Sequence, residues 1–223
     1  LKEHNYYRVS GYSLTLRKDD RFYDNATSNK LIEIYECDRE MRNVLFEATE
    51  IIETKIKSLF AYYFCEKNDP LSYDDLSYYK NEEEISKIVK KSEELKEKWK
   101  IHELYIRHYE ETGEKIPLWA YVDLYTMTDI SKLYLNLNDD DIKSKIAAEY
   151  GFTQVGILDN ALHSIAVLRN MCAHGVRLYN KSFITKPKLS KKDKLILRRE
   201  GSEIIFNKLF FYILLIKRLL KEE

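Results

Sequence analysis

The chain has few of the residues that interrupt helices. Its 223 residues include only 6 glycines and 3 prolines. These two residues are the least favourable ones in a helix interior, so their scarcity favours long uninterrupted helices. No alternating strand pattern or internal repeat is visible. We therefore predict an all-α fold, an up-and-down helical bundle that forms a single domain over residues 1–223.

Cysteine and long apolar runs are also scarce. The three cysteines, Cys37, Cys65 and Cys172, are odd in number and lack Cys-x-x-Cys spacing, which is typical of a reducing cytoplasm rather than of a disulfide framework. The longest apolar run, 209–216, is far shorter than the roughly 20 residues that a membrane span needs. No signal peptide is visible, so we expect a cytoplasmic protein without a membrane partner. Because the chain begins with Leu1 rather than Met, we also expect that a short N-terminal segment is missing.

The net charge is zero, but its distribution is uneven. Residues 161–223 contain 14 Lys+Arg and 5 Asp+Glu, which gives a net charge of +9. Residues 1–160 contain the other 23 Lys+Arg and 32 Asp+Glu, which gives a net charge of −9. A basic C-terminal part suits contact with phosphates, although basic tails also occur on proteins that bind no nucleic acid.

The spacing of apolar residues predicts where the helices lie. Residues 81–112 differ from the others because they are dense in Glu and Lys and poor in apolar positions, which indicates an exposed helical arm. We interpret residues 80–116 as a charged helical insertion. The remaining helices are predicted over residues 31–65, 118–137, 155–178 and 193–221, with a short helix between an N-cap at 139–141 and Gly151.

The most informative segment is Arg-Asn-Met-Cys-Ala-His at residues 169–174. Arg169 interrupts an apolar helical stripe, where an arginine needs a partner. Asn170, His174 and Arg177 follow the spacing i, i+4 and i+7 and would form a polar line on one face of the predicted helix. Such a helix is suited to hold charge against a partner.

Structural roles are alternatives for these residues. Arg169 can form a structural ion pair with Glu50 or Glu53. The alternative for these two glutamates is that they are ordinary residues on a helix surface. His174 can cap the carbonyl groups at a helix C-terminus, and Arg177 can bind either a phosphate or an acidic neighbour. Elsewhere, Asp38 and Arg42 are four residues apart within an apolar stripe, which indicates a buried structural pair. His102 and His108 lack further ligands at suitable spacing, so we predict no metal site.

The longer string RNMCAHGVRLYN at residues 169–180 resembles the signature of the Abi-like (AbiD/AbiF-type) abortive-infection proteins of the HEPN superfamily, whose hallmark is Arg-x4-6-His. NYYRVSGY at residues 5–12 resembles an N-terminal block of this family, and YECDREMR at 35–42 resembles the next. Further along, the residues Pro117-Leu118-Trp119, with Asp123 and Ser131, resemble a third block of this family. The chain departs from the pattern at Gly175, where many relatives have a second histidine, and at residues 126–128.

The resemblance implies a HEPN-like bundle with ribonuclease activity. It implies cleavage of single-stranded RNA by attack of the 2′-hydroxyl on the adjacent phosphate, without a metal or other cofactor and without DNA as a partner. Histidine, with an ordinary pKa of about 6.5, can exchange a proton at neutral pH, and arginine can hold a phosphate through two N–H groups. The residues implied are Arg169, His174 and Asn170 for catalysis and Glu50 and Glu53 for support. For RNA binding we predict Arg177 and, from the basic C-terminal part, Lys181, Lys186 and Lys188.

A homodimer is expected from helix geometry together with the resemblance, which implies a site built between two chains as in other HEPN ribonucleases. Five residues at about 100° each place Arg169 and His174 about 140° apart around one helix, so they do not converge within a single chain. A two-fold axis would bring the two motif helices side by side and form one site at their interface. The resemblance further implies a toxic nuclease in anti-phage defence, restrained by a small non-coding RNA. Two alternatives are a catalytically silent RNA-binding protein and a toxin that a protein antitoxin neutralises by binding the acidic arm.

Overall fold

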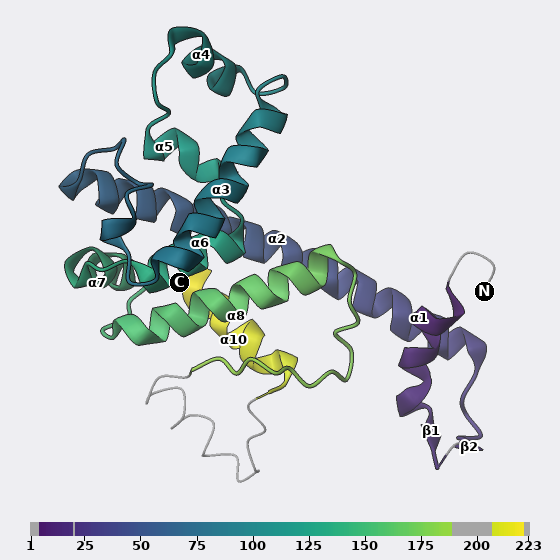
Figure 1. The fold of residues 1–223 in the computed structure, drawn as a ribbon. Coiled ribbons are helices and arrows are strands. Elements are labelled where there is room, and N and C mark those ends of the chain that lie inside the picture. The colour runs from purple at the N-terminus through teal and green to yellow at the C-terminus, as the bar shows by residue number, and fades with distance from the viewer. Residues whose placement is uncertain (1–4, 20, 189–206, 221–223) are drawn as a thin grey trace.

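The chain is an all-α bundle with a small two-stranded antiparallel sheet near its N-terminus, as a computed structural model shows for residues 5–19, 21–188 and 207–220. The predicted fold class is confirmed. The elements in chain order are α1 (Tyr6–Ser10), η1 (Gly11–Thr15), β1 (Arg17–Lys18), β2 (Arg21–Phe22), α2 (Ser28–Lys67), η2 (Leu76–Tyr78), α3 (Glu82–Trp99), α4 (Leu104–Thr112), α5 (Leu118–Tyr121), η3 (Val122–Leu124), α6 (Met127–Asn136), α7 (Asp140–Glu149), α8 (Val155–Ala173) and α10 (Leu209–Leu220) (Figure 1).

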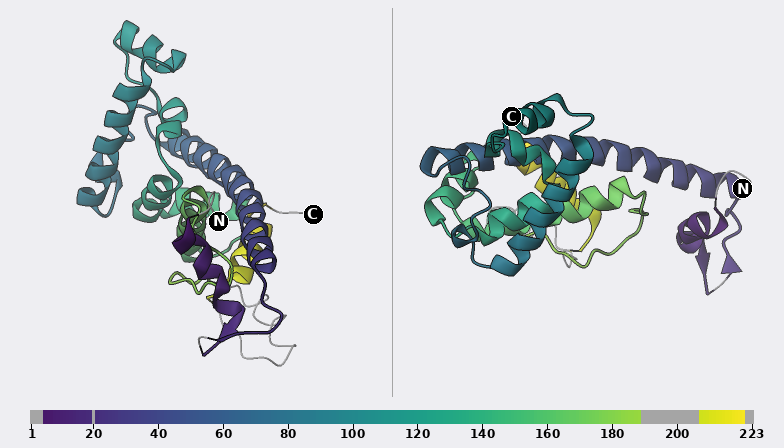
Figure 2. Two further views of the ribbon diagram at one scale, coloured as in Figure 1. Left: turned by 90° about the vertical axis from the view of Figure 1, so that its right-hand side faces the viewer. Right: turned by 45° about the horizontal axis from the view of Figure 1, so that its top comes forward.

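The long helix α2 connects the two ends of the molecule. Its 40 residues contain no glycine or proline and span about 60 Å. The Thr27 hydroxyl caps its N-terminus by accepting a hydrogen bond from the Lys30 N–H at 3.2 Å, and Pro70 follows shortly after its C-terminus. The helix predicted over 31–65 is thus confirmed and is slightly longer at both ends. Figure 2 shows that the bundle surrounds one half of α2, whereas the N-terminal segment lies at the other end.

The core forms where α8 packs against α2 and α6. Along α8, residues that follow helical spacing are fully buried and belong to one cluster with fully buried residues of α2. These side chains are Leu158, Leu162, Ile165 and Leu168 on α8, and Ile52, Ile56, Phe60 and Phe64 on α2. This packing fixes which side of α8 remains accessible.

The single helix predicted over residues 118–137 is wrong. After α5 and the turn η3, Tyr125 is extended, and Thr126 begins the separate helix α6. The Thr126 hydroxyl accepts from the Asp129 N–H, and the Asp129 carboxylate accepts from the Thr126 N–H at 3.0 Å. This reciprocal capping box satisfies donors at a helix start and so begins a new helix within a continuous apolar pattern.

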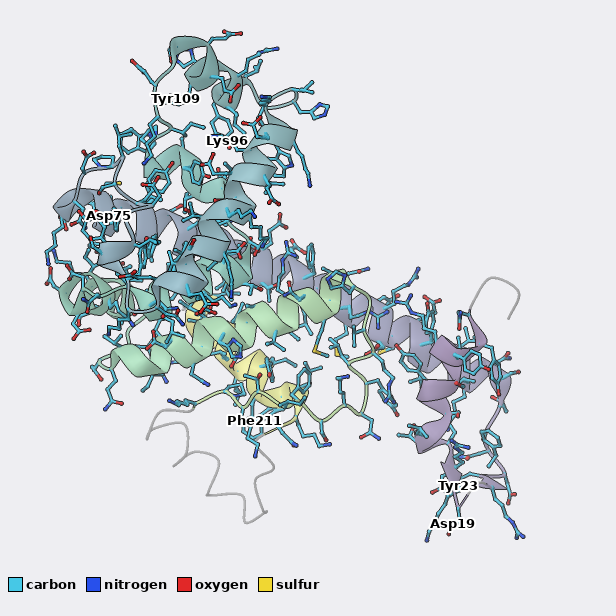
Figure 3. All side chains as sticks on the ribbon, viewed as in Figure 1. Asp19, Tyr23, Asp75, Lys96, Tyr109 and Phe211 are labelled. Carbon is cyan, nitrogen blue, oxygen red and sulfur yellow. The ribbon has the colours of Figure 1, made fainter. Side chains whose placement is uncertain are left out.

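The charged arm projects from the bundle, but its base belongs to the core. Helices α3 and α4 form it, and Figure 3 shows Lys96 and Tyr109 at its outer part. Ile85 of α3 is nevertheless fully buried where α3 packs against α6 and η3, and Ile106 of α4 is fully buried as well. The arm is therefore exposed mainly at its far end. Its origin as an insertion, and the assignment of residues 1–223 to one domain, stay predictions.

The next short helix has the predicted boundaries. The Asp139 carboxylate accepts hydrogen bonds from the N–H groups of Asp141 and Ile142, both at 3.1 Å, and so caps α7. Gly151 has a φ of +70°, which is easy for glycine and ends this helix.

The motif helix ends earlier than the predicted residue 178. Helix α8 ends at Ala173, and Gly175 has a φ of +62°. The N–H groups of Gly175 and Val176 donate to the carbonyls of Cys172 and Met171, at 3.0 and 2.8 Å. This is the Schellman arrangement, which turns the chain away from the helix axis. The predicted polar line through Asn170, His174 and Arg177 is consequently wrong, because Arg177 is not on the helix.

The C-terminal helix is described only in its last part. Helix α10 covers Leu209–Leu220, and residues 193–206 of the helix predicted over 193–221 lie outside the described residues. Phe211 and Tyr212 are buried, since α10 packs against both α2 and α8. No described helix has the length and apolar character needed to cross a membrane.

A buried carboxylate joins three segments that are far apart in sequence. Asp38 of α2 accepts hydrogen bonds from the Tyr12 hydroxyl at 2.5 Å and from the Tyr179 N–H at 2.7 Å, and it also accepts from the Leu178 N–H. It forms the predicted buried ion pair with Arg42 as well. We call Asp38, Arg42, Tyr12 and the N–H groups of Leu178 and Tyr179 the Asp38 node.

Aromatic contacts surround the Asp38 node. The Tyr12 ring packs edge-on against Tyr35, and it stacks with Tyr179 at 6.3 Å between centroids. Burial, together with the hydrogen bond to the Asp38 carboxylate, raises the pKa of Tyr12 to about 12. Tyr12 therefore stays protonated at neutral pH and acts as a hydrogen-bond donor in the node.

Asp38→Asn should destabilise the fold strongly. The substitution keeps the shape of the side chain but leaves Arg42 as a buried charge without its partner, which typically costs about 3–5 kcal/mol. Urea unfolding should show this loss, whereas Glu40→Gln, an exposed change on the same helix, should stay within about 0.5 kcal/mol of the unsubstituted protein. Similar stabilities for the two variants would contradict the central role of the node.

Candidate functional site

Helix α8 presents the motif on its last turn. Leu168 and Cys172 face the core, Arg169 and Asn170 are half-buried, and His174 is exposed at the C-cap. The apolar spacing of α8 decides this orientation, because burial of one side leaves the other facing solvent.

Arg169 is held in place by α2. Its Nε donates to Glu53 Oε2 at 3.2 Å, and its guanidinium lies 5.3 Å from the centre of the Phe46 ring. Glu53 is buried and also forms an ion pair with Lys57 at 3.1 Å. The Arg169 side chain is still 30% exposed. Because Nε makes the bond to Glu53, and no bond joins the terminal N–H groups of the guanidinium to another described residue, these groups can bind a further ligand.

The two glutamates differ although they are three residues apart. The ion pair with Arg169, which the sequence allows for either glutamate, is made by Glu53. Glu50 is exposed, and no hydrogen bond or ion pair joins it to the described part of the chain. The structure thus brings Glu53, but not Glu50, to the motif.

Asn170 and His174 have different surroundings. The Asn170 side-chain amide donates to the Thr128 hydroxyl at 3.1 Å, which links the motif to the start of α6. The His174 N–H closes the last helical turn by donating to the Asn170 carbonyl at 3.0 Å, while its imidazole is in solvent. An exposed imidazole is accessible to a ligand and can take part in proton exchange.

Arg177 makes contacts that sequence reasoning did not anticipate. It lies beyond α8, where its Nη1 donates to the Gly11 carbonyl at 2.6 Å and its guanidinium lies 5.9 Å from the centre of the Tyr12 ring. The partner that the structure shows is a backbone carbonyl, and a phosphate contact of Arg177 stays a prediction. Arg177 connects the motif loop to the N-terminal segment.

The three lysines do not gather around the motif. Lys181 follows the motif loop closely, where its N–H donates to the Leu178 carbonyl. The Lys186 carbonyl and the Lys188 N–H bind the side chain of Asn160, at 3.3 and 2.6 Å. Asn160 lies 14 residues before His174 on α8, about 21 Å along the helix. Lys186 and Lys188 therefore belong to a different part of the surface from His174.

Arg8 is a residue near the motif that sequence reasoning missed. It is exposed on α1, and its Nη2 donates to the Gly175 carbonyl at 2.6 Å. Gly175 directly follows His174, so Arg8 brings a second cation next to the motif. The only signal in the sequence was that Arg8 and the motif both lie in blocks of the same resemblance.

Cys172 lies within the motif but is not suited to nucleophilic chemistry. Burial raises the pKa of its thiol to about 11, so the thiol stays protonated at neutral pH. The described residues contain no group of three or more His, Cys, Asp or Glu side chains placed to hold a metal ion.

The arrangement combines a fixed cation with an exposed imidazole. Arg169 can hold an anionic group through its free N–H groups, and His174 can exchange a proton. The two side chains lie on different sides of α8, because they are five residues apart. One chain thus supplies an arginine and a histidine that suit phosphate chemistry, but helix geometry does not bring the two side chains to the same phosphate.

Comparison with known proteins gives one match. A family model described as Abi-like protein matches residues 1–180, most of the chain. No curated protein and no solved structure matches it. The matched region includes α1, the Asp38 node and the motif helix, and it ends where the lysine-containing segment begins.

Substitution of the two glutamates should separate their roles. Glu53→Gln leaves Arg169 and Lys57 without their carboxylate, so we expect a loss of about 1–2 kcal/mol in the free energy of unfolding. Glu50→Gln changes an exposed side chain and should alter it by no more than about 0.5 kcal/mol. Urea unfolding of both variants measures the difference, and equal effects would contradict a structural role specific to Glu53.

Proposed function

Because this chain belongs to the Abi-like protein family, we propose that it acts in abortive-infection defence as a metal-independent endoribonuclease of the HEPN type. The observation that carries this proposal is the pairing of an oriented arginine with an exposed histidine on the last turn of α8. Glu53 orients Arg169 without occupying its terminal N–H groups, which is what a phosphate-binding arginine needs.

The proposed reaction cleaves single-stranded RNA at a phosphodiester. A 2′-hydroxyl attacks the adjacent phosphorus, the bond to the 5′-oxygen breaks, and the products carry a cyclic phosphate and a 5′-hydroxyl. His174 takes the proton from the 2′-hydroxyl or gives one to the leaving 5′-oxygen. Arg169 stabilises the negative charge that builds up on the phosphate oxygens. Asn170, which Thr128 orients, positions the phosphate.

The proposed active unit is a homodimer. Arg169 and His174 lie on different sides of α8, so a complete site needs a second motif helix. The side of α8 opposite its buried leucines is available for such a contact. In the dimer, Arg169 from one protomer and His174 from its partner act on the same phosphate.

The proposed restraint is a small non-coding RNA. Lys186 and Lys188 lie beside Asn160, about 21 Å along α8 from His174. A regulatory RNA bound there would contact the protein outside the catalytic residues. A protein antitoxin is the second candidate, and the exposed far end of the acidic arm favours it. Salt separates the two, because phosphate contacts weaken steeply with ionic strength. A catalytically silent RNA-binding protein is the third candidate.

Loss of either motif side chain should abolish cleavage. Arg169→Ala and His174→Ala should each slow the cutting of a labelled single-stranded RNA by about 10²–10⁴-fold. The unsubstituted protein should cut equally well in EDTA. His108→Ala, an exposed change on α4, is the matched control and should keep full activity. Circular dichroism confirms folding. If both motif variants cut RNA at the normal rate, the catalytic assignment is wrong.

Mixing two inactive variants tests the shared site. Dimers that contain one Arg169→Ala chain and one His174→Ala chain have an intact arginine and an intact histidine on opposite protomers. We expect the mixture to recover cleavage that neither variant has alone, and sedimentation should show dimers. A mixture that stays inactive, or an active protein that is strictly monomeric at micromolar concentration, contradicts the shared site.

A further inference from the structure

The N-terminal helix α1 is fixed beside the motif loop. Arg8 Nη2 donates to the Gly175 carbonyl at 2.6 Å, and Arg177 returns a bond to the Gly11 carbonyl at 2.6 Å. Two hydrogen bonds in opposite directions thus connect residues 8–11 with residues 175–177. Val9 is buried on the inner side of α1, which anchors the helix to the Asp38 node.

Gly175 makes the position of Arg8 possible. A Cβ on residue 175 would overlap with Nη2 of Arg8, and a φ of +62° would strain any residue with a side chain. The absence of a side chain therefore allows a guanidinium to enter directly after His174. Only one of its five N–H groups is used by the Gly175 carbonyl, and the side chain is exposed, so the others can bind an anion.

Two tyrosines precede Arg8 and face solvent. Tyr6 is 68% exposed and Tyr7 is 84% exposed, and their rings meet edge to face at 5.6 Å. Neither contributes to the buried clusters, although large aromatic side chains normally pack in a core or cover it. Exposed aromatic rings next to a cation are the combination with which proteins bind single-stranded nucleic acid, because rings stack on bases and cations bind the backbone.

The surrounding charge is favourable for RNA. Residues 5–23 contain four Lys+Arg and two Asp, although residues 1–160 as a whole are acidic. In Figure 3, Asp19 and Tyr23 mark the outer end of this N-terminal segment, which lies next to the end of α2. The segment is thus a locally basic region within the acidic part of the chain.

We propose that Tyr6, Tyr7 and Arg8 form the part of the site that holds the single-stranded RNA substrate beside His174. Arg8 binds a backbone phosphate next to the one that is cleaved, and the tyrosines stack on unpaired bases. This inference rests on the proposed ribonuclease function, and it assigns substrate binding to α1 rather than to Lys186 and Lys188. A double helix would not fit this role, since its bases are already stacked on one another.

Binding of a defined RNA tests the proposal. The full chain with His174→Ala, which prevents cleavage, is titrated against a fluorescent single-stranded RNA of 12 nucleotides, and anisotropy is recorded at several salt concentrations. Adding Tyr7→Ala should weaken binding at least about fivefold, the loss of one stacked base. The same variant should bind an abasic ribose-phosphate chain of equal length as well as its parent does, because no base is left to stack.

Arg8→Gln should act differently from Tyr7→Ala. It should weaken binding of both oligonucleotides and reduce the slope of log affinity against log salt by about 0.7, the value for one phosphate contact on a single strand. Tyr62→Ala and Arg107→Gln are the matched controls. Tyr62 is 63% exposed on α2, about 30 Å along that helix from Arg42, and Arg107 is exposed on α4. Both controls should bind RNA normally.

The outcomes separate this inference from the proposed function. Normal RNA binding by Tyr7→Ala and Arg8→Gln, in a protein that cleaves RNA when His174 is present, overturns the role of α1 alone. Tyr7→Ala decides the question even if Arg8→Gln fails to fold, since Tyr7 makes no buried contact. Weakened binding in a protein that never cleaves RNA supports the role of α1 and overturns the nuclease. Absence of any RNA binding overturns both.

Discussion

The structure depends on the satisfaction of one buried carboxylate. Asp38 accepts hydrogen bonds from Tyr12, from Arg42 and from the backbone of residues 178 and 179, so segments from three parts of the chain end at one side chain. A buried charge is costly unless it is paired and hydrogen-bonded. One mutual arrangement of the N-terminal segment, α2 and the motif loop meets this requirement. The node therefore holds these three segments in one mutual arrangement.

Residues that contact the motif come from distant segments of the chain. Helix α2 supplies Glu53 and Phe46 to Arg169, α6 supplies Thr128 to Asn170, and α1 supplies Arg8 to Gly175. Each contact holds a side chain or carbonyl that helix α8 alone would leave free to move. Positioning of catalytic groups by packed neighbours is what keeps a site in its working geometry. Helix α8 carries the motif residues of the proposed site, and the other segments orient them.

The basic residues of the C-terminal part divide by what they contact. Arg177 donates to the Gly11 carbonyl and so connects the motif loop to the N-terminal segment. Arg169 combines a structural bond with free donors. Gly175 has a positive role in this chain, because the absence of a Cβ there admits Arg8. Net charge and spacing do not distinguish Arg169 from Arg177, since both are cations near one motif.

The sequence by itself determined the helical class, the extent of α2 and the ends of α7, because these follow from local apolar spacing, caps and the scarcity of glycine and proline. It also indicated the Asp38–Arg42 pair, whose partners are one helical turn apart. Local caps within a continuous apolar pattern set the break before α6 and the end of α8. Tertiary structure decided the choice of Glu53 over Glu50 and the contact of Arg8 with Gly175. These depend on contacts between residues up to 167 positions apart, which no local pattern encodes.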